Sequence, residues 1–191
     1  GTTVEELDTR SVLNISKIRF PWLFASWLGG MGAFIIIERF SQSLASMAIL
    51  SAFIPIIMGM GGNAGNQAAT VIVRGLALGE LQARDLLSVL WREIRVGVLL
   101  GGLYGIMLGA MVWIYYVFNK QTPDIEPERI MMVAGLSILF VMTVGVGVGA
   151  FFPMLFKRLK IDPAIATAPF VATALDIGGI IIFFLIAKAF L

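Results

Sequence analysis

The sequence predicts an all-α integral membrane protein with five transmembrane helices per chain. Of its 191 residues, 59% are hydrophobic and only 14% are charged, and the mean hydropathy is +0.93. A soluble domain of this length could not bury so much apolar surface, so the composition indicates a polytopic membrane protein. Five apolar runs are separated by charged segments, and each is long enough to cross a hydrocarbon core of about 30 Å.

A polar segment precedes the first apolar run, and the second run contains a polar stretch of its own. Residues 1–19 are polar, and we expect a cytosolic or interfacial connecting helix there, ahead of a pore domain at 20–191. The first apolar run covers 20–37. The second covers 44–73 and contains a polar, glycine-rich stretch at 59–67, which cannot face lipid. We expect this stretch to interrupt the second helix.

The remaining three runs complete the membrane domain. The third covers 86–118, and its amphipathic first third is expected at the membrane interface. Glycines then recur every four residues at 97, 101, 105 and 109, which predicts a smooth strip for close helix contact. The fourth run covers 130–156, and the fifth extends from Pro163 to Leu191.

The distribution of basic residues predicts the topology. Five spans place the termini on opposite sides of the membrane. With the N-terminus inside, ten basic residues are cytosolic: Arg10, Lys17, Arg19, Arg74, Arg84, Arg92, Arg95, Lys157, Arg158 and Lys160. Four are outside: Arg39, Lys120, Arg129 and Lys188. This positive-inside bias predicts an N-in, C-out orientation, and it accounts for the pI of 9.2 without nucleic-acid binding.

The fifth run contains one carboxylate. No charged residue lies between Asp162 and Lys188 except Asp176, which would therefore sit roughly 20 Å from either charge on a helix. A charge near the bilayer midplane costs at least a few kcal/mol unless it faces water or a partner, so Asp176 is a candidate functional residue. The structural alternative is a protonated carboxyl that is hydrogen-bonded between helices.

The available side chains restrict the chemistry. The chain has no cysteine and no histidine, so a metal must be held by oxygen, which favours hard cations. Pro169, Ala172 and Thr173 share a helix side with Asp176, and their small side chains leave carbonyl oxygens accessible to a cation. Asn63, Asn66 and Gln67 either offer oxygens to a cation or bond to other backbone groups.

Enzymatic alternatives are poorly supported. An intramembrane aspartyl protease needs two carboxylates at one site, whereas the membrane runs supply one mid-membrane acid per chain. Serine–histidine and metal–histidine chemistry is excluded by the absence of histidine. We therefore predict that the protein is not an enzyme.

Two stretches, 55–81 and 162–184, resemble the membrane domain of the MgtE magnesium channels, which are related to a solute-carrier family of animals. The resemblance implies a homodimer in the cell membrane, with a pore on its two-fold axis lined mainly by the second and fifth helices. It implies a metal site at Asp176 and the backbone carbonyl of Ala172. It also implies pore-lining positions at Gly62, Asn63, Asn66 and Ala168, to which the helix-side pattern adds Pro169 and Thr173. Some members carry Asn where Ala168 stands, so its contribution here is limited to backbone.

Such family members usually begin with a cytosolic helical domain and a pair of CBS domains that sense Mg²⁺. Neither is in this sequence, as expected for an excised membrane domain or for a member without the sensor. Residues 1–16 correspond in position to the family's connecting, plugging helix.

These observations predict a divalent-cation channel for passive Mg²⁺ influx. Two Asp176 carboxylates facing each other across a dimer axis could hold a hydrated ion through its waters. Alternatives are a proton- or sodium-coupled carrier for divalent cations and a membrane interaction module without transport. Mn²⁺, Co²⁺, Ni²⁺ and Ca²⁺ are alternatives to Mg²⁺ as the transported ion.

Overall fold

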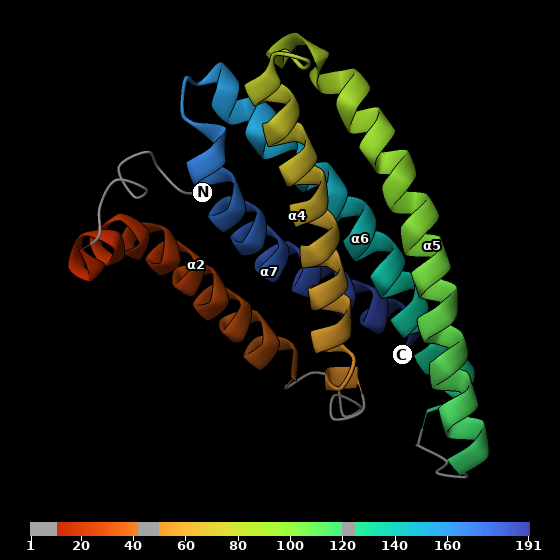
Figure 1. Cartoon of the computed structure of the whole chain (residues 1–191). Coiled ribbons are helices and arrows are strands. Elements are labelled where there is room, and N and C mark those ends of the chain that lie inside the picture. Colours follow the sequence, from red (N-terminus) through yellow and green to blue (C-terminus); the bar gives the residue numbers. More distant parts are fainter. Residues whose placement is uncertain (1–10, 42–49, 120–124) are drawn as a thin grey trace.

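The computed structural model describes residues 11–41, 50–119 and 125–191, and nearly all of them are helical (Figure 1). The long helices are α2 (Val12–Ser41), α4 (Ile54–Leu78), α5 (Leu86–Asn119), α6 (Pro127–Arg158) and α7 (Pro163–Phe190). A short 3₁₀ turn, η1 (Ala83–Asp85), precedes α5. Five long helices in the described ranges confirm the predicted all-α class.

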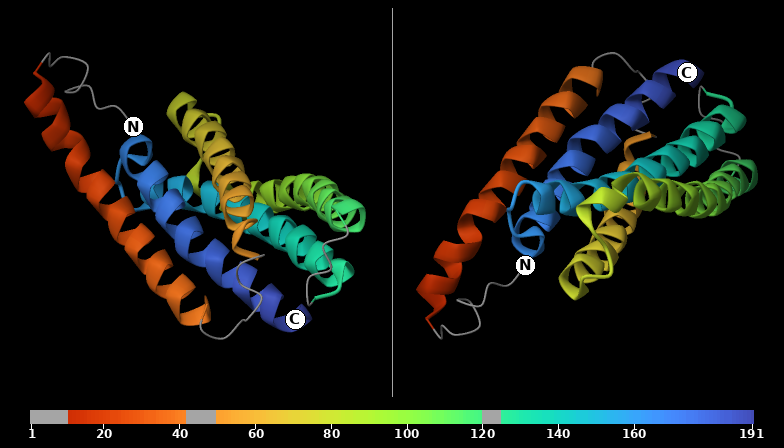
Figure 2. Two further views of the ribbon diagram at one scale, coloured as in Figure 1. Left: turned by 90° about the horizontal axis from the view of Figure 1, so that it is seen from below. Right: turned by 90° about the horizontal axis from the view of Figure 1, so that it is seen from above.

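Helix α6 lies at the centre of the bundle. It packs against α4, α5 and α7, while α2 packs against α7 at the edge of the molecule (Figures 1 and 2). The main core cluster is built largely from fully buried residues of α6 and α7, among them Val141, Ile138, Phe183 and Phe184. Because α6 touches three neighbours, its contacts fix how α4 and α7 are placed relative to each other.

Within the described ranges, four helices are long and apolar enough to cross a membrane, namely α2, α5, α6 and α7. Helix α4 has 25 residues, a length of about 37 Å at 1.5 Å per residue. That length would cross a bilayer, but α4 is not apolar enough to be one of these four helices. The fifth span therefore stays a prediction.

Helix α4 corrects one expectation from the sequence. We expected an interruption at 59–67, whereas α4 is continuous from Ile54 to Leu78. Its glycines at 61 and 65 are buried against α6, where a β-carbon on Gly145 would lie 2.6 Å from the carbonyl oxygen of Gly61. Close tertiary packing thus outweighs the low helix propensity of glycine. The continuous helix also satisfies its own backbone groups, as a membrane requires.

Helix α2 extends beyond its predicted span, whereas α5 coincides with the predicted third run to within one residue. Helix α2 begins at Val12 and passes through Pro21 without a break, so residues 12–19 of the predicted connecting helix share one helix with the first apolar run, and residues 1–10 lie outside the described residues. Helix α5 begins at Leu86, so its amphipathic first third continues directly into the span.

The predicted glycine strip on α5 is confirmed. A β-carbon on Gly101 would lie 2.8 Å from the carbonyl oxygen of Leu139, and one on Gly105 would lie 2.6 Å from that of Gly135. Gly97 and Gly109 contact α6 in the same way, at Thr143 and Met131. These contacts need the absence of a side chain, which is how small residues bring membrane helices together.

Substituting Gly149 by alanine should destabilise the fold. Its new β-carbon would collide with the carbonyl oxygen of Gly65, and overpacking of this kind costs about 1–3 kcal/mol. Gly102→Ala is the matched control, because a β-carbon there meets nothing within 4 Å and alanine favours helix by up to about 1 kcal/mol. Thermal unfolding in detergent measures both variants. Equal melting temperatures for the two would contradict the close α4–α6 contact.

Candidate cation site

Helix α7 is held at both of its ends. At the N-terminus, the backbone N–H of Ala164 donates to the Oδ1 of Asp162 at 2.9 Å, which caps the helix. At the C-terminus, Arg129 of α6 donates from Nη1 to the carbonyl oxygen of Phe190 at 3.1 Å. Helix α7 stays continuous through Pro169. The central part of α7, which carries Asp176, is therefore positioned by contacts at both ends.

Asp176 lies halfway along the 28-residue α7. Thr173 and Ile177 contact glycines of α2, whereas Leu175 contacts Gly65 of α4. Successive helical residues are rotated by about 100°, which places Asp176 between these two contact faces. Helices α2 and α4 lie on either side of α7 in Figure 1. The carboxylate thus belongs to the side of α7 that these two helices border.

The Asp176 side chain is partly exposed. The alternative to a functional role is a protonated carboxyl that is hydrogen-bonded between helices. Among the residues that the structure describes, no hydrogen bond or ion pair to Asp176 is found. If Asp176 had a purely structural role, we would expect a hydrogen bond from it to another helix of the same chain. The described part of the chain provides none.

Helix α4 presents a row of small and polar residues that the described part of the chain leaves uncovered. Gly59, Gly62, Asn66 and Thr70 follow one another at spacings of three and four, so they share one side of the helix. A β-carbon on Gly59 or Gly62 would meet nothing within 4 Å, and Asn66 and Thr70 are exposed. Packing against the described residues therefore does not explain these two glycines. We call this row the α4 stripe.

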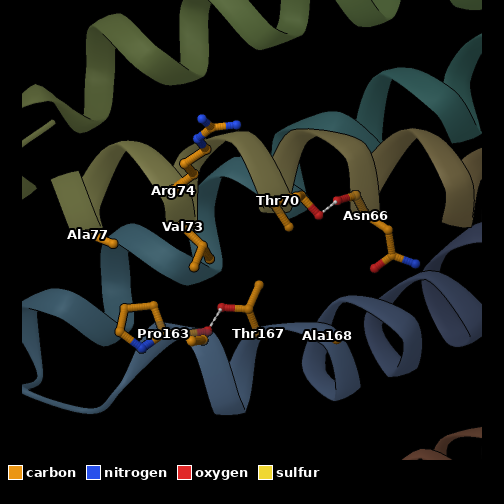
Figure 3. A pocket seen from close by; sticks show the side chains of 10 residues that line it. Asn66, Thr70, Val73, Arg74, Ala77, Pro163, Thr167 and Ala168 are labelled. Atoms are coloured by element: carbon orange, nitrogen blue, oxygen red, sulfur yellow. Dashed lines mark hydrogen bonds between the residues drawn. The ribbon is translucent and has the colours of Figure 1, made fainter. Parts of the chain in front are cut away.

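A cavity of about 350 Å³ lies between the end of the α4 stripe and the first turns of α7 (Figure 3). Asn66, Thr70 and Arg74 line it from α4, and Thr167 and Ala168 line it from α7. The threonine hydroxyls donate to backbone carbonyls of their own helices, Thr70 to Asn66 at 2.8 Å and Thr167 to Pro163. The structure thus brings together two of the predicted pore-lining positions, Asn66 and Ala168.

Asn63 does not line the cavity of Figure 3. It lines a second cavity between α4, α5 and α6, together with Gln67 and Glu93. The three carboxamides of the 63–67 stretch are therefore divided between two sides of α4. The role predicted for Asn63 in the pore stays a prediction, and its position is at the margin of the α4 stripe.

Sequence reasoning missed Arg74 and Thr167 as residues of the Figure 3 cavity. The signal for Arg74 was its place four residues after Thr70, which continues the spacing of the α4 stripe. Thr167 directly precedes Ala168, and it is buried in the first turns of α7. Both lie at the same end of the bundle.

No group of three or more acidic, histidine or cysteine side chains that could share a metal occurs within the described ranges. A cation at Asp176 would need further oxygen ligands, and the candidates are the carbonyl of Ala172, water and a second copy of the chain. This chemistry suits a hydrated hard cation better than a fully stripped one.

Comparison with known proteins decides the family. The family model MgtE, described as a divalent cation transporter, matches residues 54–186, which is most of the chain. The chain belongs to the MgtE family. It is therefore a multi-pass membrane protein of a transporter family and not an enzyme, and the resemblance noted in the sequence is confirmed.

Three MgtE relatives, each called magnesium transporter MgtE, align with nearly the whole chain. The Thermus thermophilus protein is 35% identical over 174 residues, which cover 91% of this chain and 36% of the relative. The Bacillus subtilis protein is 31% identical over 184 residues, covering 96% and 39%. The Enterococcus faecalis protein is 31% identical over 191 residues, covering 100% and 40%. The chain thus spans about two fifths of the length of these relatives.

Removing the cap of α7 should loosen the helix that carries Asp176. Asp162→Ala deletes the acceptor for the Ala164 N–H, and the loss of such a cap costs about 1 kcal/mol. Asp162→Asn keeps a side-chain acceptor and should retain most of the stability. Unfolding in detergent compares the two variants with the parent chain. A larger loss for Asn than for Ala would contradict the capping role.

Proposed function

We propose that this chain forms the pore domain of a homodimeric Mg²⁺ channel that mediates passive influx across the cell membrane. One observation carries the proposal. The carboxylate of Asp176, in the apolar helix α7, lies on the side of α7 that borders α4, and the adjoining α4 stripe is small, polar and uncovered by the described part of the chain. An ionisable residue at membrane depth is expected to face water or a partner.

The single carboxylate favours a dimer with a shared axis. Mg²⁺ prefers octahedral oxygen coordination and releases its water reluctantly, so one carboxylate per chain is too few to strip it. A two-fold axis beside α7 would supply a second Asp176 from the partner. The pair would then hold a hydrated ion through its waters. The width of the pore and the electrostatic field of the two carboxylates would set the selectivity among cations.

The other pore positions follow from their placement near Asp176. The carbonyl of Ala172, one turn before Asp176, would accept hydrogen bonds from the ion's water shell, with Pro169 on the same side of α7. Thr173 would border the pore from the α2 side, where it contacts Gly29. Gly62 and Asn66 would form the opposite wall, and Ala168 would contribute backbone near the α7 N-terminus. Asn63 would reach the pore only at its margin, given its place in the second cavity.

The membrane potential favours passive influx. A membrane potential that is negative inside favours entry of a divalent cation by roughly 4–5 kcal/mol per 100 mV, twice the value for a single charge. No coupling to ATP or to another ion is then required for accumulation. The names of the three relatives support Mg²⁺ as the ion.

Replacing Asp176 by asparagine should abolish transport while keeping the shape of the side chain. We expect Mg²⁺ flux into liposomes to fall at least tenfold, equivalent to about 1.4 kcal/mol of lost cation stabilisation. Glu80→Gln is the control, because Glu80 is exposed in the connection after α4 and the substitution changes charge by the same amount. Chromatography of both variants should show the dimer intact.

Planar-bilayer recording on the parent chain completes the test. A channel passes discrete single-channel currents, and a coupled carrier passes none. Flux that is unchanged in Asp176→Asn would reject the role as pore ligand.

A cysteine at position 176 should cross-link across the proposed axis. The chain has no native cysteine, so Asp176→Cys places one thiol in each protomer. A bis-thiosulfonate linker of about 8 Å, longer than the Cα–Cα range of a direct disulfide, should produce a covalent dimer. Gly178→Cys is the control at the same depth, because it points to the other side of α7 and meets nothing within 4 Å. Equal cross-linking of both would place the axis elsewhere.

A further inference from the structure

A second cavity lies between α4, α5 and α6, on a different side of α4 from the cavity of Figure 3. Its volume is about 430 Å³. Asn63 and Gln67 of α4 and Glu93 and Tyr104 of α5 line it, alongside apolar residues that include Met142 of α6. All four polar side chains offer oxygen atoms, which are the ligands that hard cations take.

Glu93 is the anionic group of this cavity. The residue is only 9% exposed, and it follows Leu86 by seven positions, about 10 Å along α5. Arg92 donates to Glu93 Oε1 from Nε at 3.2 Å and from Nη2 at 3.0 Å. Both of these bonds reach the same oxygen. In the described part of the chain, no hydrogen bond reaches Oε2, so half of the carboxylate is available to a ligand in the cavity.

The two carboxamides are also available. Asn63 and Gln67 are four residues apart on continuous α4, and both are exposed. Neither has a hydrogen-bond partner among the described residues. Within a membrane, carboxamides that face lipid without a partner are costly, so a polar occupant is favoured over an acyl chain.

We propose that this cavity is a second cation site, separate from Asp176, which takes a hydrated divalent cation. Glu93 Oε2 supplies the charge, and the oxygens of Asn63 and Gln67 accept hydrogen bonds from the ion's water shell. Six waters at about 30 Å³ each occupy roughly 180 Å³, which the cavity accommodates. The site does not require Asp176 to be a pore ligand.

The Arg92 side chain acts as the competing cation. It is 51% exposed, so its guanidinium can move to the membrane interface when an ion approaches Glu93. Because the ion must displace part of this ion pair, we expect weaker binding than at a bare carboxylate. Removing the competitor by Arg92→Gln should therefore tighten binding.

Mn²⁺ binding to the full chain in detergent tests the site, with free Mn²⁺ counted by electron paramagnetic resonance in a background of sodium chloride. Glu93→Gln should lower bound Mn²⁺ by one equivalent per chain, and Asp176→Asn should leave that equivalent in place. Glu80→Gln, which makes the same charge change at an exposed position, should bind like the parent. Mg²⁺ should displace the bound Mn²⁺.

A second variant keeps the test decisive if Glu93→Gln does not fold. Gln67→Met keeps a straight, helix-compatible side chain and removes the amide, so Mn²⁺ binding at this site should weaken by about tenfold. Unchanged binding in both Glu93→Gln and Gln67→Met would overturn the second site. Displacement by Na⁺ alone would overturn its divalent character.

The same measurement tests the second site and the proposed pore site at Asp176 independently. If Asp176→Asn loses no Mn²⁺ while Glu93→Gln does, the second site stands and the pore ligand is rejected. If only Asp176→Asn loses Mn²⁺, the pore site stands and the second site is rejected.

Discussion

The contact between α4 and α6 is the constraint on which the site depends. Their backbones meet at glycines, with Gly61 and Gly65 on α4 against Gly145 and Gly149 on α6. No side chain separates the helices there, so van der Waals contact between the backbones replaces the hydrophobic effect, which gives little association inside a bilayer. Because α4 turns its glycines inward at these positions, its other sides carry the carboxamides, the threonine and the arginine that line two cavities.

Helix α7 completes the arrangement. It is the most apolar of the helices by hydropathy, and it contains the carboxylate that a bilayer tolerates least. Besides α6, two neighbours contact it: α2 through Thr173 and Ile177, and α4 through Leu175. The end contacts at Asp162 and Arg129 add hydrogen bonds at both termini. Asp176 is therefore held by a rigid helix and not by a loop.

Much of this could be predicted from the sequence. Hydropathy located the helices, and four-residue glycine spacing located the α5–α6 contact. The mid-membrane depth of Asp176, inferred from the lack of charges around it, stays a prediction. The continuity of α4 could not be predicted, because the glycines that weaken an isolated helix are the same ones that stabilise it against α6. The separation of Asn63 from Asn66 was also missed. They are three positions apart and thus share a general side of the helix, and only the neighbours α5 and α7 decide which cavity each enters.

The edge position of α2 has a consequence for how the protein is assembled. Helix α2 is the first long helix of the described chain, and its main partner, α7, is the last. During synthesis α2 would enter the membrane well before Thr173 and Ile177 exist to receive its glycines. Until α7 has been inserted, α2 would lie in lipid with its stacked Phe20, Phe24 and Trp27 rings on its surface. The side of α7 that carries Asp176 thus gains its border with α2 only when a helix inserted early meets one inserted much later.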